Sequence, residues 1–432
     1  MSDAQDYLEL VKESFDPQLI SALYKNFSNQ YIALLELLDN AVDDRLENER
    51  LTISVQYDAE EKKLTIKNVN GLGLDTEGIK KFFTWGKGRE EYNRIGRYGQ
   101  GGKAAIGYLA QSFVIRSHPL NSPNGYLIKV EDWEDRKDGF KEFKIEPFRM
   151  LDKAGSVTFE LYNLKKTFSI STIKSKIQEI YRPLINNGKV KFIVNSDTIE
   201  VSKPNYDTDT RSKFSLPFSY EGKNLILYGE YGIVSDKNSP RGGFNVYQFG
   251  RLVTQKEYFG HTDPSKRWNV ERLYGELHVD FEIPLLMNKT DIDRDSGIWK
   301  EISVLMKNEI ESAIRLAIDY KTPTRREENA VKQVRSKIKE DLKDLKSEIE
   351  LSNYGSTILY KVIKGSNGKS RLLINRGHPA YQYWSETSVG KKLYVVMIYS
   401  LYRSIEGISK SESSKLHTHF SESLIQQIKK MR

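Results

Sequence analysis

One stretch decides the fold of this chain: Glu36-Leu37-Leu38-Asp39-Asn40-Ala41-Val42-Asp43. Apolar residues recur around it at helical spacing, and positions three, four and seven apart share one side of a helix. Glu36, Asp39, Asn40 and Asp43 therefore form a polar stripe on an otherwise apolar helix. A buried stripe needs partners, and a metal with a water would supply them, since an amide oxygen binds Mg²⁺ and a carboxylate orients water. A solvated amphipathic surface helix is the alternative.

Two glycine-rich segments follow this helix and favour the first interpretation. Asn70-Gly71-Leu72-Gly73 comes directly after an expected strand, and glycines there let backbone approach a ligand closely. Six glycines then fall between Gly86 and Gly102, interleaved with lysines and arginines, before an expected helix at 103–109. Backbone amides freed by glycine bind anions, a helix N-terminus adds a favourable dipole, and such a loop can serve as a lid. The segment matches neither a Walker A loop nor a dinucleotide fingerprint.

Composition bounds the class of protein. The 432 residues are enough for two or three domains, and 38% hydrophobic with 29% charged residues is typical of a soluble globular chain. There is no cysteine, which excludes disulfides and cysteine-based zinc sites. No apolar run approaches membrane-span length, and the polar start argues against a signal peptide, so we expect a cytoplasmic protein without membrane contact. The net charge of +8 is compatible with a polyanionic partner.

The order of elements predicts an α+β sandwich, with helices on one face of a mixed sheet. Beyond the helix around Glu36 and the helix at 103–109, alternating patterns predict strands at Leu51–Gln56, Lys63–Lys67, Ser112–Arg116, Tyr126–Glu131, Phe140–Ile145 and Val157–Tyr162. A second sheet is expected from strands at Leu225–Tyr231, Phe244–Phe249 and Leu277–Phe281, followed by an amphipathic helix at Trp299–Tyr320.

The motifs together resemble the GHKL superfamily, whose Bergerat ATP-binding fold occurs in gyrase B subunits, MutL, the ninety-kilodalton heat-shock chaperone and histidine kinases. The resemblance is carried by Glu36-x-x-x-Asn40-Ala-x-Asp43, Asn70-Gly71-x-Gly73, Gly96-x-x-Gly99-x-Gly101-x-Lys103 and Gly155-Ser156. Their order and spacing, over roughly 120 residues, are far more specific than any single motif. The chain looks most similar to the MORC and MutL branch. There, a second, S5-like transducer domain resembles residues 244–253 and 280–291 of this chain.

The resemblance implies roles for particular residues. Glu36 is implied as the general base that orients the attacking water, which favours ATP hydrolysis over phosphotransfer to histidine. Asn40 is implied as the Mg²⁺ ligand, and Asp43 supports the pocket or stays on the helix surface. Lys289 matches a lysine that reaches the γ-phosphate, or is an ordinary turn lysine. The remaining implied nucleotide contacts are Gly71, Gly73, the lid residues Gly99, Gln100, Gly101, Gly102 and Lys103, and Ser156 near the adenine.

The second motif departs from the family pattern. The family places an Asp two residues before the first glycine of this motif, where this chain has Val69. Counting along the strand from Ile66 reaches Asn68 instead, as if one residue were inserted. An amide oxygen can accept the same hydrogen bond from the adenine amino group, without the assistance of a charge. We therefore predict that Asn68 binds the adenine.

The expected domains are an ATP-binding domain at 1–165, a transducer domain at 166–320, a charged helical arm at 321–351 and a C-terminal α/β piece at 352–432. The resemblance implies Mg²⁺-dependent ATP hydrolysis that drives homodimerisation. The clamp would act on double-stranded DNA or a partner protein on DNA, and prokaryotic relatives of this kind are associated with anti-phage defence. A chaperone-like remodelling ATPase and a nucleotide-sensing module with little turnover are the alternatives. Salt-dependent DNA binding would discriminate between the first two.

Overall fold

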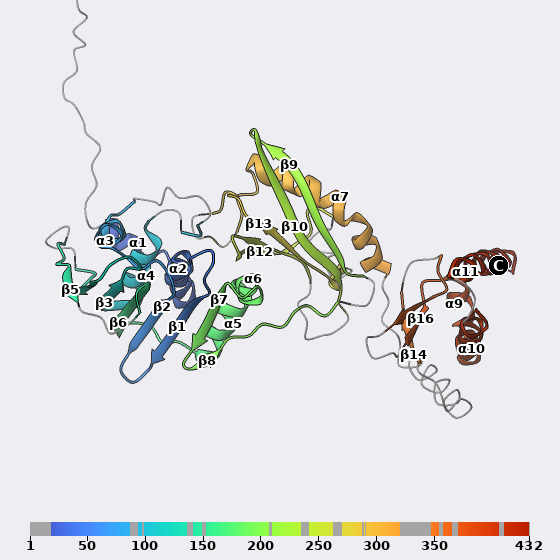
Figure 1. The fold of residues 1–432 in the computed structure, drawn as a ribbon. Helices are drawn as coiled ribbons and strands as arrows, with labels where there is room; N and C mark the ends of the chain where they lie inside the picture. Colours follow the sequence, from blue (N-terminus) through green and yellow to red (C-terminus); the bar gives the residue numbers. More distant parts are fainter. Residues whose placement is uncertain are drawn as a thin grey trace, which may run out of the picture.

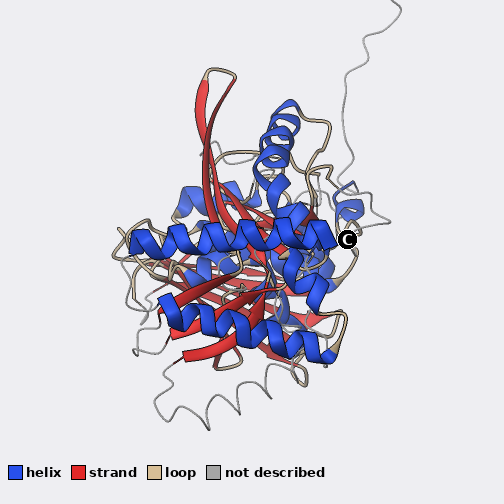
Figure 2. Ribbon diagram, turned by 90° about the vertical axis from the view of Figure 1, so that its right-hand side faces the viewer, coloured by secondary structure: helices blue, strands red, loops and turns tan. Residues whose placement is uncertain are grey.

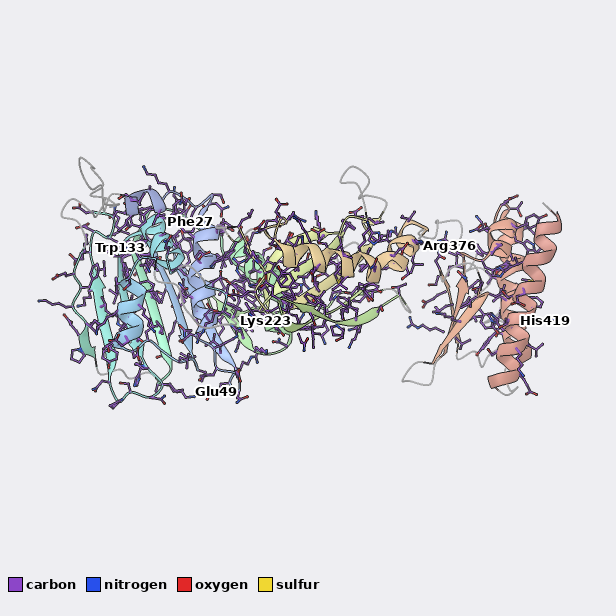
Figure 3. The ribbon with its side chains drawn as sticks, turned by 90° about the horizontal axis from the view of Figure 1, so that it is seen from above. Phe27, Glu49, Trp133, Lys223, Arg376 and His419 are labelled. Atoms are coloured by element: carbon purple, nitrogen blue, oxygen red, sulfur yellow. The ribbon has the colours of Figure 1, made fainter. Side chains whose placement is uncertain are left out.

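The computed structural model describes most of the chain: residues 19–86, 94–96, 99–135, 141–148, 153–206, 210–234, 242–261, 270–286, 289, 291–319, 347–353, 357–364, 370–405 and 410–431. These residues form three parts, each with a sheet and an apolar core, and the core of the first part also includes Phe249 from the second. Figure 3 shows them in a row, with Trp133 in the first part, Lys223 in the second and Arg376 and His419 in the third.

The first part is built on an eight-stranded mixed sheet (Figure 1). In spatial order its strands are β5 (Glu146–Phe148), β4 (Gly125–Val130), β3 (Ala110–His118), β6 (Ser156–Leu164), β2 (Lys63–Val69), β1 (Leu51–Asp58), β7 (Val190–Val194) and β8 (Asp197–Thr198). The helices are α1 (Leu19–Leu23), α2 (Gln30–Asp43), α3 (Thr76–Phe83), α4 (Gly101–Leu109), α5 (Ile170–Ile180) and α6 (Arg182–Asn186). Helices α2 and α4 pack on each other and on the sheet. The expected α+β sandwich is thereby confirmed.

Helix α2 forms as the sequence predicts, and its start is fixed locally. Asn29 is the N-cap, and its side-chain oxygen accepts hydrogen bonds from the backbone amides of Tyr31 and Ile32. The apolar residues of the helix are buried in the core between the sheet and α4. The polar stripe is buried as well: Asp39 is 0% exposed and Asp43 is 2% exposed. A solvated surface stripe is therefore excluded.

The second part holds a five-stranded sheet whose spatial order is β12 (Arg251–Glu257), β11 (Gly243–Gln248), β13 (Leu273–Val279), β10 (Lys223–Ile233) and β9 (Ser212–Tyr220). Strands β9 and β10 extend as a long hairpin beyond the rest of the sheet (Figures 1 and 2). Helix α7 (Gly297–Asp319) covers the sheet through apolar residues such as Trp299 and Ile302.

The third part contains a three-stranded sheet in the order β14 (Ser347–Ser352), β16 (Ser370–Asn375) and β15 (Tyr360–Lys364). Helices α9 (Pro379–Trp384), α10 (Ser388–Ile405) and α11 (Lys410–Met431) pack beside it around buried tyrosines. His378 is the N-cap of α9, and its side chain accepts from the backbone amide of Ala380. None of the described helices is long and apolar enough to cross a membrane.

The structure differs from the sequence expectations in three places. Residues 141–145 are not a strand, and the short strand β5 begins only at Glu146. The charged helical arm was expected at 321–351, but β14 begins at Ser347, where it pairs in parallel with β16. The core of the first part runs to Ile199, past the expected boundary at 165, because β7 pairs in parallel with β1. The rest of the arm, residues 320–346, lies outside the described residues.

Candidate active site

Glycines of the lid segment pack directly against the polar stripe of α2. A Cβ atom placed on Gly101 would clash with Oε2 of Glu36, and one placed on Gly102 would clash with Nδ2 of Asn40. A Cβ on Gly96 would lie 3.4 Å from Oδ1 of Asn40. At Gly101 and Gly102 a side chain would displace these groups, so the N-terminus of α4 faces the carboxylate and the amide of α2. The structure thus brings together the first and third sequence motifs.

Asp43 holds the start of the lid segment to α2. Its two carboxylate oxygens accept from the backbone amides of Ile95 and Gly96, each at 2.8 Å, and its carbonyl oxygen accepts from the Arg94 guanidinium. Two amide donors on one buried carboxylate form a strong, directional anchor. The Asp43 carboxylate therefore binds the lid backbone, a function that the helix pattern alone did not distinguish from a surface position.

Lys103 is a buried cation at the first turn of α4, where it is 3% exposed. Its ammonium donates to the carbonyl of Gly99, which has a positive φ of 59°, and lies 5.4 Å from the ring centroids of Phe82 and Trp85. Burial lowers the pKa of Lys103 to about 8. Gln100 precedes the helix, and its side chain caps none of the helix amides.

The second motif lies against the end of α2. Asn70 adopts a positive φ of 65° just after β2, and within β2 the side chain of Asn68 is in phase with buried Ile66. Asn68 is 3% exposed, and its Nδ2 donates to Oδ2 of Asp44 at 2.5 Å. The backbone amide of Gly73 donates to both carboxylate oxygens of Asp44, at 3.1 and 3.2 Å. Asp44 was not among the predicted site residues.

A second group of charges joins α2 to the second part of the chain. Lys289 is 6% exposed, and its Nζ lies 2.8 Å from Oε2 of Glu36 and 3.4 Å from Oδ2 of Asp39. Arg251, at the start of β12, donates through Nε to both oxygens of Asp39, at 2.8 and 2.9 Å. The hydroxyl of Tyr181 donates a hydrogen bond to Oδ1 of Asp39 at 2.7 Å. The sequence prediction named Glu36 and Lys289 but gave no role to Asp39, Arg251 or Tyr181.

Opposite charges keep this network ionised. Burial opposes the charge on Asp39, but Arg251, Lys289 and the Tyr181 hydroxyl outweigh it and hold the pKa of Asp39 below its usual value. Burial likewise opposes the charge on Lys289, yet Asp39 and Glu36 raise its pKa above the usual value. The pKa of Arg251 is raised in the same way, by Asp39 above all other charges. The two parts of the chain are therefore joined by a buried, charged contact.

Ser156 does not point toward Asn68. Strand register places Val157 opposite Asn68, and because side chains alternate along a strand, Ser156 belongs to the other face of the sheet. Its hydroxyl is buried and has no hydrogen-bond partner among the described residues. The predicted contact of Ser156 with adenine stays a prediction.

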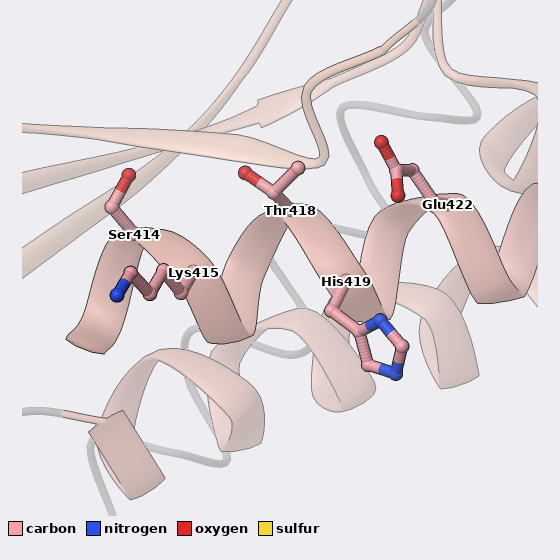
Figure 4. A pocket seen from close by; sticks show the side chains of 5 residues that line it. All are labelled: Ser414, Lys415, Thr418, His419 and Glu422. Atoms are coloured by element: carbon pink, nitrogen blue, oxygen red, sulfur yellow. The ribbon is translucent and has the colours of Figure 1, made fainter. Parts of the chain in front are cut away.

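Other candidate features lie away from this site. A shallow depression on α11 is lined by Ser414, Lys415, Thr418, His419 and Glu422, all from one helix (Figure 4). No group of three or more histidine, aspartate or glutamate side chains among the described residues is arranged to hold a metal ion. The convergence of the lid glycines and Lys289 on Glu36 and Asn40 is therefore the strongest candidate site.

Comparison with known proteins agrees with this geometry. Residues 28–158 match the family model for "Histidine kinase-, DNA gyrase B-, and HSP90-like ATPase", a span that contains α2, the glycine motifs and the start of β6. This part of the chain has a GHKL-type ATPase fold. The match supports the GHKL-type fold that the sequence motifs predicted. The MORC and MutL branch and the S5-like domain stay predictions.

The chain is also similar to a solved structure, the ATPase region of Saccharomyces cerevisiae topoisomerase II bound to ICRF-187 (dexrazoxane). The two share 13% sequence identity over 66% of this chain and 86% of that chain, with a TM-score of 0.40. No curated protein matches the chain. The family match over residues 28–158, and not this distant likeness, supports the fold of the GHKL-type domain.

Proposed function

We propose that the GHKL-type domain binds ATP with Mg²⁺ and hydrolyses it, with Glu36 as the general base. The observation that carries the proposal is the convergence of Glu36 and Asn40 with the lid glycines and with Lys289 from the second part. Such a site supplies positioning and charge stabilisation for in-line attack of water on a phosphoryl group. The water adds to the γ-phosphorus, the bond to ADP breaks, and the Glu36 carboxylate takes the proton of the water.

The residues around Asn40 fit a hydrated metal and a phosphate chain. The amide side chain is partly exposed, and the glycines at 96 and 102 leave backbone where a Cβ would fill the space beside it. Asn40 would hold Mg²⁺ through its side-chain oxygen, and the bound ion would neutralise charge on the phosphates. The amides at the start of α4 and the ammonium of Lys103 would bind phosphate oxygens.

Lys289 connects the nucleotide to the second part. In this structure its ammonium is paired with Glu36, the group that must accept the proton of water. A γ-phosphate offers the same lysine a stronger partner, so ATP binding would draw Lys289 away from Glu36 and free the base. Because Lys289 and Arg251 share Asp39, the change at Glu36 would be passed on to β12.

We extend the proposal to an ATP-dependent homodimer that acts as a clamp on double-stranded DNA or on a DNA-associated partner protein. The support is the family resemblance, the charged contact between the two parts and the net charge of +8. A role in prokaryotic anti-phage defence rests on the resemblance alone. A nucleotide-sensing module with little turnover is the second candidate, favoured by the ion pair that engages Glu36.

Calorimetric titration with a non-hydrolysable ATP analogue tests the site. Wild type should bind with Mg²⁺ and more weakly without it, and Asn40→Ala should abolish that difference. The matched control Asn224→Ala lies on the exposed β9–β10 hairpin and should bind like wild type. Absence of binding by folded wild type would refute the nucleotide site.

Light scattering tests the clamp. A saturating concentration of the ATP analogue should double the mass of the wild-type protein. A 30-base-pair duplex should then co-elute with this dimer in low salt and dissociate from it as salt rises. A mass that stays monomeric with bound analogue would reject the clamp and favour the sensing module.

A further inference from the structure

Helix α10 carries apolar side chains on two sides. One side packs into the core of the third part through buried residues such as Tyr394 and Ile398. On the other side, Val389, Leu393 and Val396 are 67%, 55% and 44% exposed. We infer that these three side chains, which form the α10 stripe, bind an amphipathic helix of a partner protein whose apolar face is flanked by acidic residues. The inference concerns the third part alone and does not rest on the nucleotide site.

The α10 stripe is a continuous row. Its members are four and three positions apart, which places them on one side of the helix. Ser400, four positions further on, is exposed on the same side, so the row follows about three helical turns without a charged residue in it. In Figure 1, α10 lies on the far side of the third sheet from the second part, where a partner can reach it.

Another helix shows the ordinary pattern of a single exposed apolar residue. Val304 of α7 is 60% exposed, but the exposed residues four and seven positions further along are Asn308 and Glu311. Scattered exposed apolar residues are normal on proteins, whereas contiguous ones mark interaction sites. Apolar side chains spaced by four and three residues are also the pattern by which one helix binds another. The α10 stripe is therefore explained by a helix that covers it.

The charge around the stripe selects an acidic partner. Lys391 and Lys392 lie in the sequence between Val389 and Leu393, and neither forms an ion pair with another residue that the structure describes. The positive end of the helix dipole is at the same end of α10. The sequence of α10 contains no aspartate or glutamate, and Glu386, which precedes the helix, offsets only one of these charges. Carboxylates beside the apolar face of a partner helix would complement this surface.

Two other occupants fit the stripe less well. A second copy of α10 would place a basic helix against the same basic helix, and like charges across an interface are unfavourable. A helix that lies in a membrane surface buries a broad apolar face. The α10 stripe is a single row of side chains, which is the width of a seam between two helices. An acidic amphipathic helix matches both the shape and the charge.

Binding of designed peptides to the full chain tests the inference. Three synthetic helical peptides share one apolar face, with leucines at the spacing of the α10 stripe. They differ only in the flanking residues, which are glutamate, glutamine or lysine. The glutamate peptide should bind at least about tenfold more tightly than the lysine peptide in low salt, and this ratio should fall as salt rises. Fluorescence anisotropy of the labelled peptides measures the affinities.

Substitutions locate the binding surface. Leu393→Gln should weaken binding of the glutamate peptide at least about tenfold, because it removes the central apolar side chain of the stripe. The matched control Val304→Gln alters a similarly exposed residue of α7 and should leave the affinity unchanged. The double variant Lys391→Glu/Lys392→Glu should make the lysine peptide the tighter ligand. Circular dichroism checks that each variant keeps the wild-type helix content.

Every other result overturns the inference. Equal affinities for the glutamate and lysine peptides would remove the charge argument, and wild-type affinity in folded Leu393→Gln would place binding elsewhere. Wild type that binds none of the peptides would also refute it. A mass that doubles with protein concentration and stays monomeric in Leu393→Gln would assign the stripe to a second copy. Leu393-dependent binding to vesicles of anionic phospholipid would assign it to a membrane surface.

Discussion

The Nζ atom of Lys289 lies 2.8 Å from Oε2 of Glu36, although 253 positions separate the two residues. Both side chains are buried, and Asp39 lies 3.4 Å from the same ammonium. The pKa of Lys289 is raised by Asp39 and Glu36, so this buried lysine stays charged at neutral pH. Lys289 also has a positive φ of 51°, an uncommon conformation that its surroundings must enforce.

Replacing Lys289 should therefore separate binding from turnover. Lys289→Ala is expected to lower the rate of ATP hydrolysis by about a hundredfold or more, because charge stabilisation at the phosphate is lost. Affinity for a non-hydrolysable analogue should change by much less. Lys213→Ala, on an exposed position of β9, serves as the control. Weaker binding with unchanged turnover at saturating ATP would place Lys289 in ground-state binding alone.

The contact between Arg251 and Asp39 should hold the two parts together. Arg251→Ala leaves Asp39 short of its main partner, and removal of one member of a buried ion pair costs about 3–5 kcal/mol. Urea unfolding followed by circular dichroism should show this loss. Arg315→Ala, which breaks an exposed pair with Glu311, should change stability by less than about 1 kcal/mol. Similar effects of the two substitutions would contradict a buried charged contact.

Nucleotide affinity should depend on the protonation of Lys103. In the free protein the pKa of Lys103 is about 8, so its ammonium loses its charge as pH rises through that value. A bound phosphate would keep Lys103 protonated. Binding then requires proton uptake above pH 8, and affinity should fall about tenfold between pH 7 and pH 9. Lys103→Arg keeps its charge throughout and should flatten the profile. A wild-type affinity that is constant over this range would show that Lys103 does not bind phosphate.

The absence of a side chain at Gly101 should matter for catalysis. A methyl group there would displace the Glu36 carboxylate, and Gly101→Ala is expected to slow hydrolysis by about tenfold or more. Gly188→Asn is the control: no atom lies within 4 Å of a Cβ there, and asparagine tolerates its φ of 74°. Wild-type turnover by Gly101→Ala would contradict the packing of the lid against the base.

Sequence periodicity was sufficient for much of this architecture. The predicted strand Lys63–Lys67 lies within β2, and the predicted helix at 103–109 lies within α4, because both have strong local patterns. Strand β12 carries no such alternation, since its first four residues are all buried, and it was not predicted. The strand predicted at Phe140–Ile145 was wrong over residues 141–145, which form no strand despite their alternating pattern.

Some residues of the candidate site were predictable from the sequence, and others were not. The helical spacing indicated a polar stripe that contains Glu36 and Asn40, and the family resemblance implied their roles. Arg251 and Tyr181 reach Asp39 only through tertiary folding, so no spacing in the sequence could connect them. Asp44 was missed because its contacts with Asn68 and with the backbone amide of Gly73 arise only through tertiary folding.

The central claim is that Glu36 activates water for hydrolysis of bound ATP. The most direct measurement compares phosphate release by wild type and Glu36→Ala in the presence of Mg²⁺, with analogue binding measured on the same samples and exposed Glu61→Ala as control. The account predicts that Glu36→Ala binds nucleotide but hydrolyses it about a hundredfold or more slowly. Unchanged turnover by Glu36→Ala, or nucleotide binding without any turnover by wild type, would contradict it.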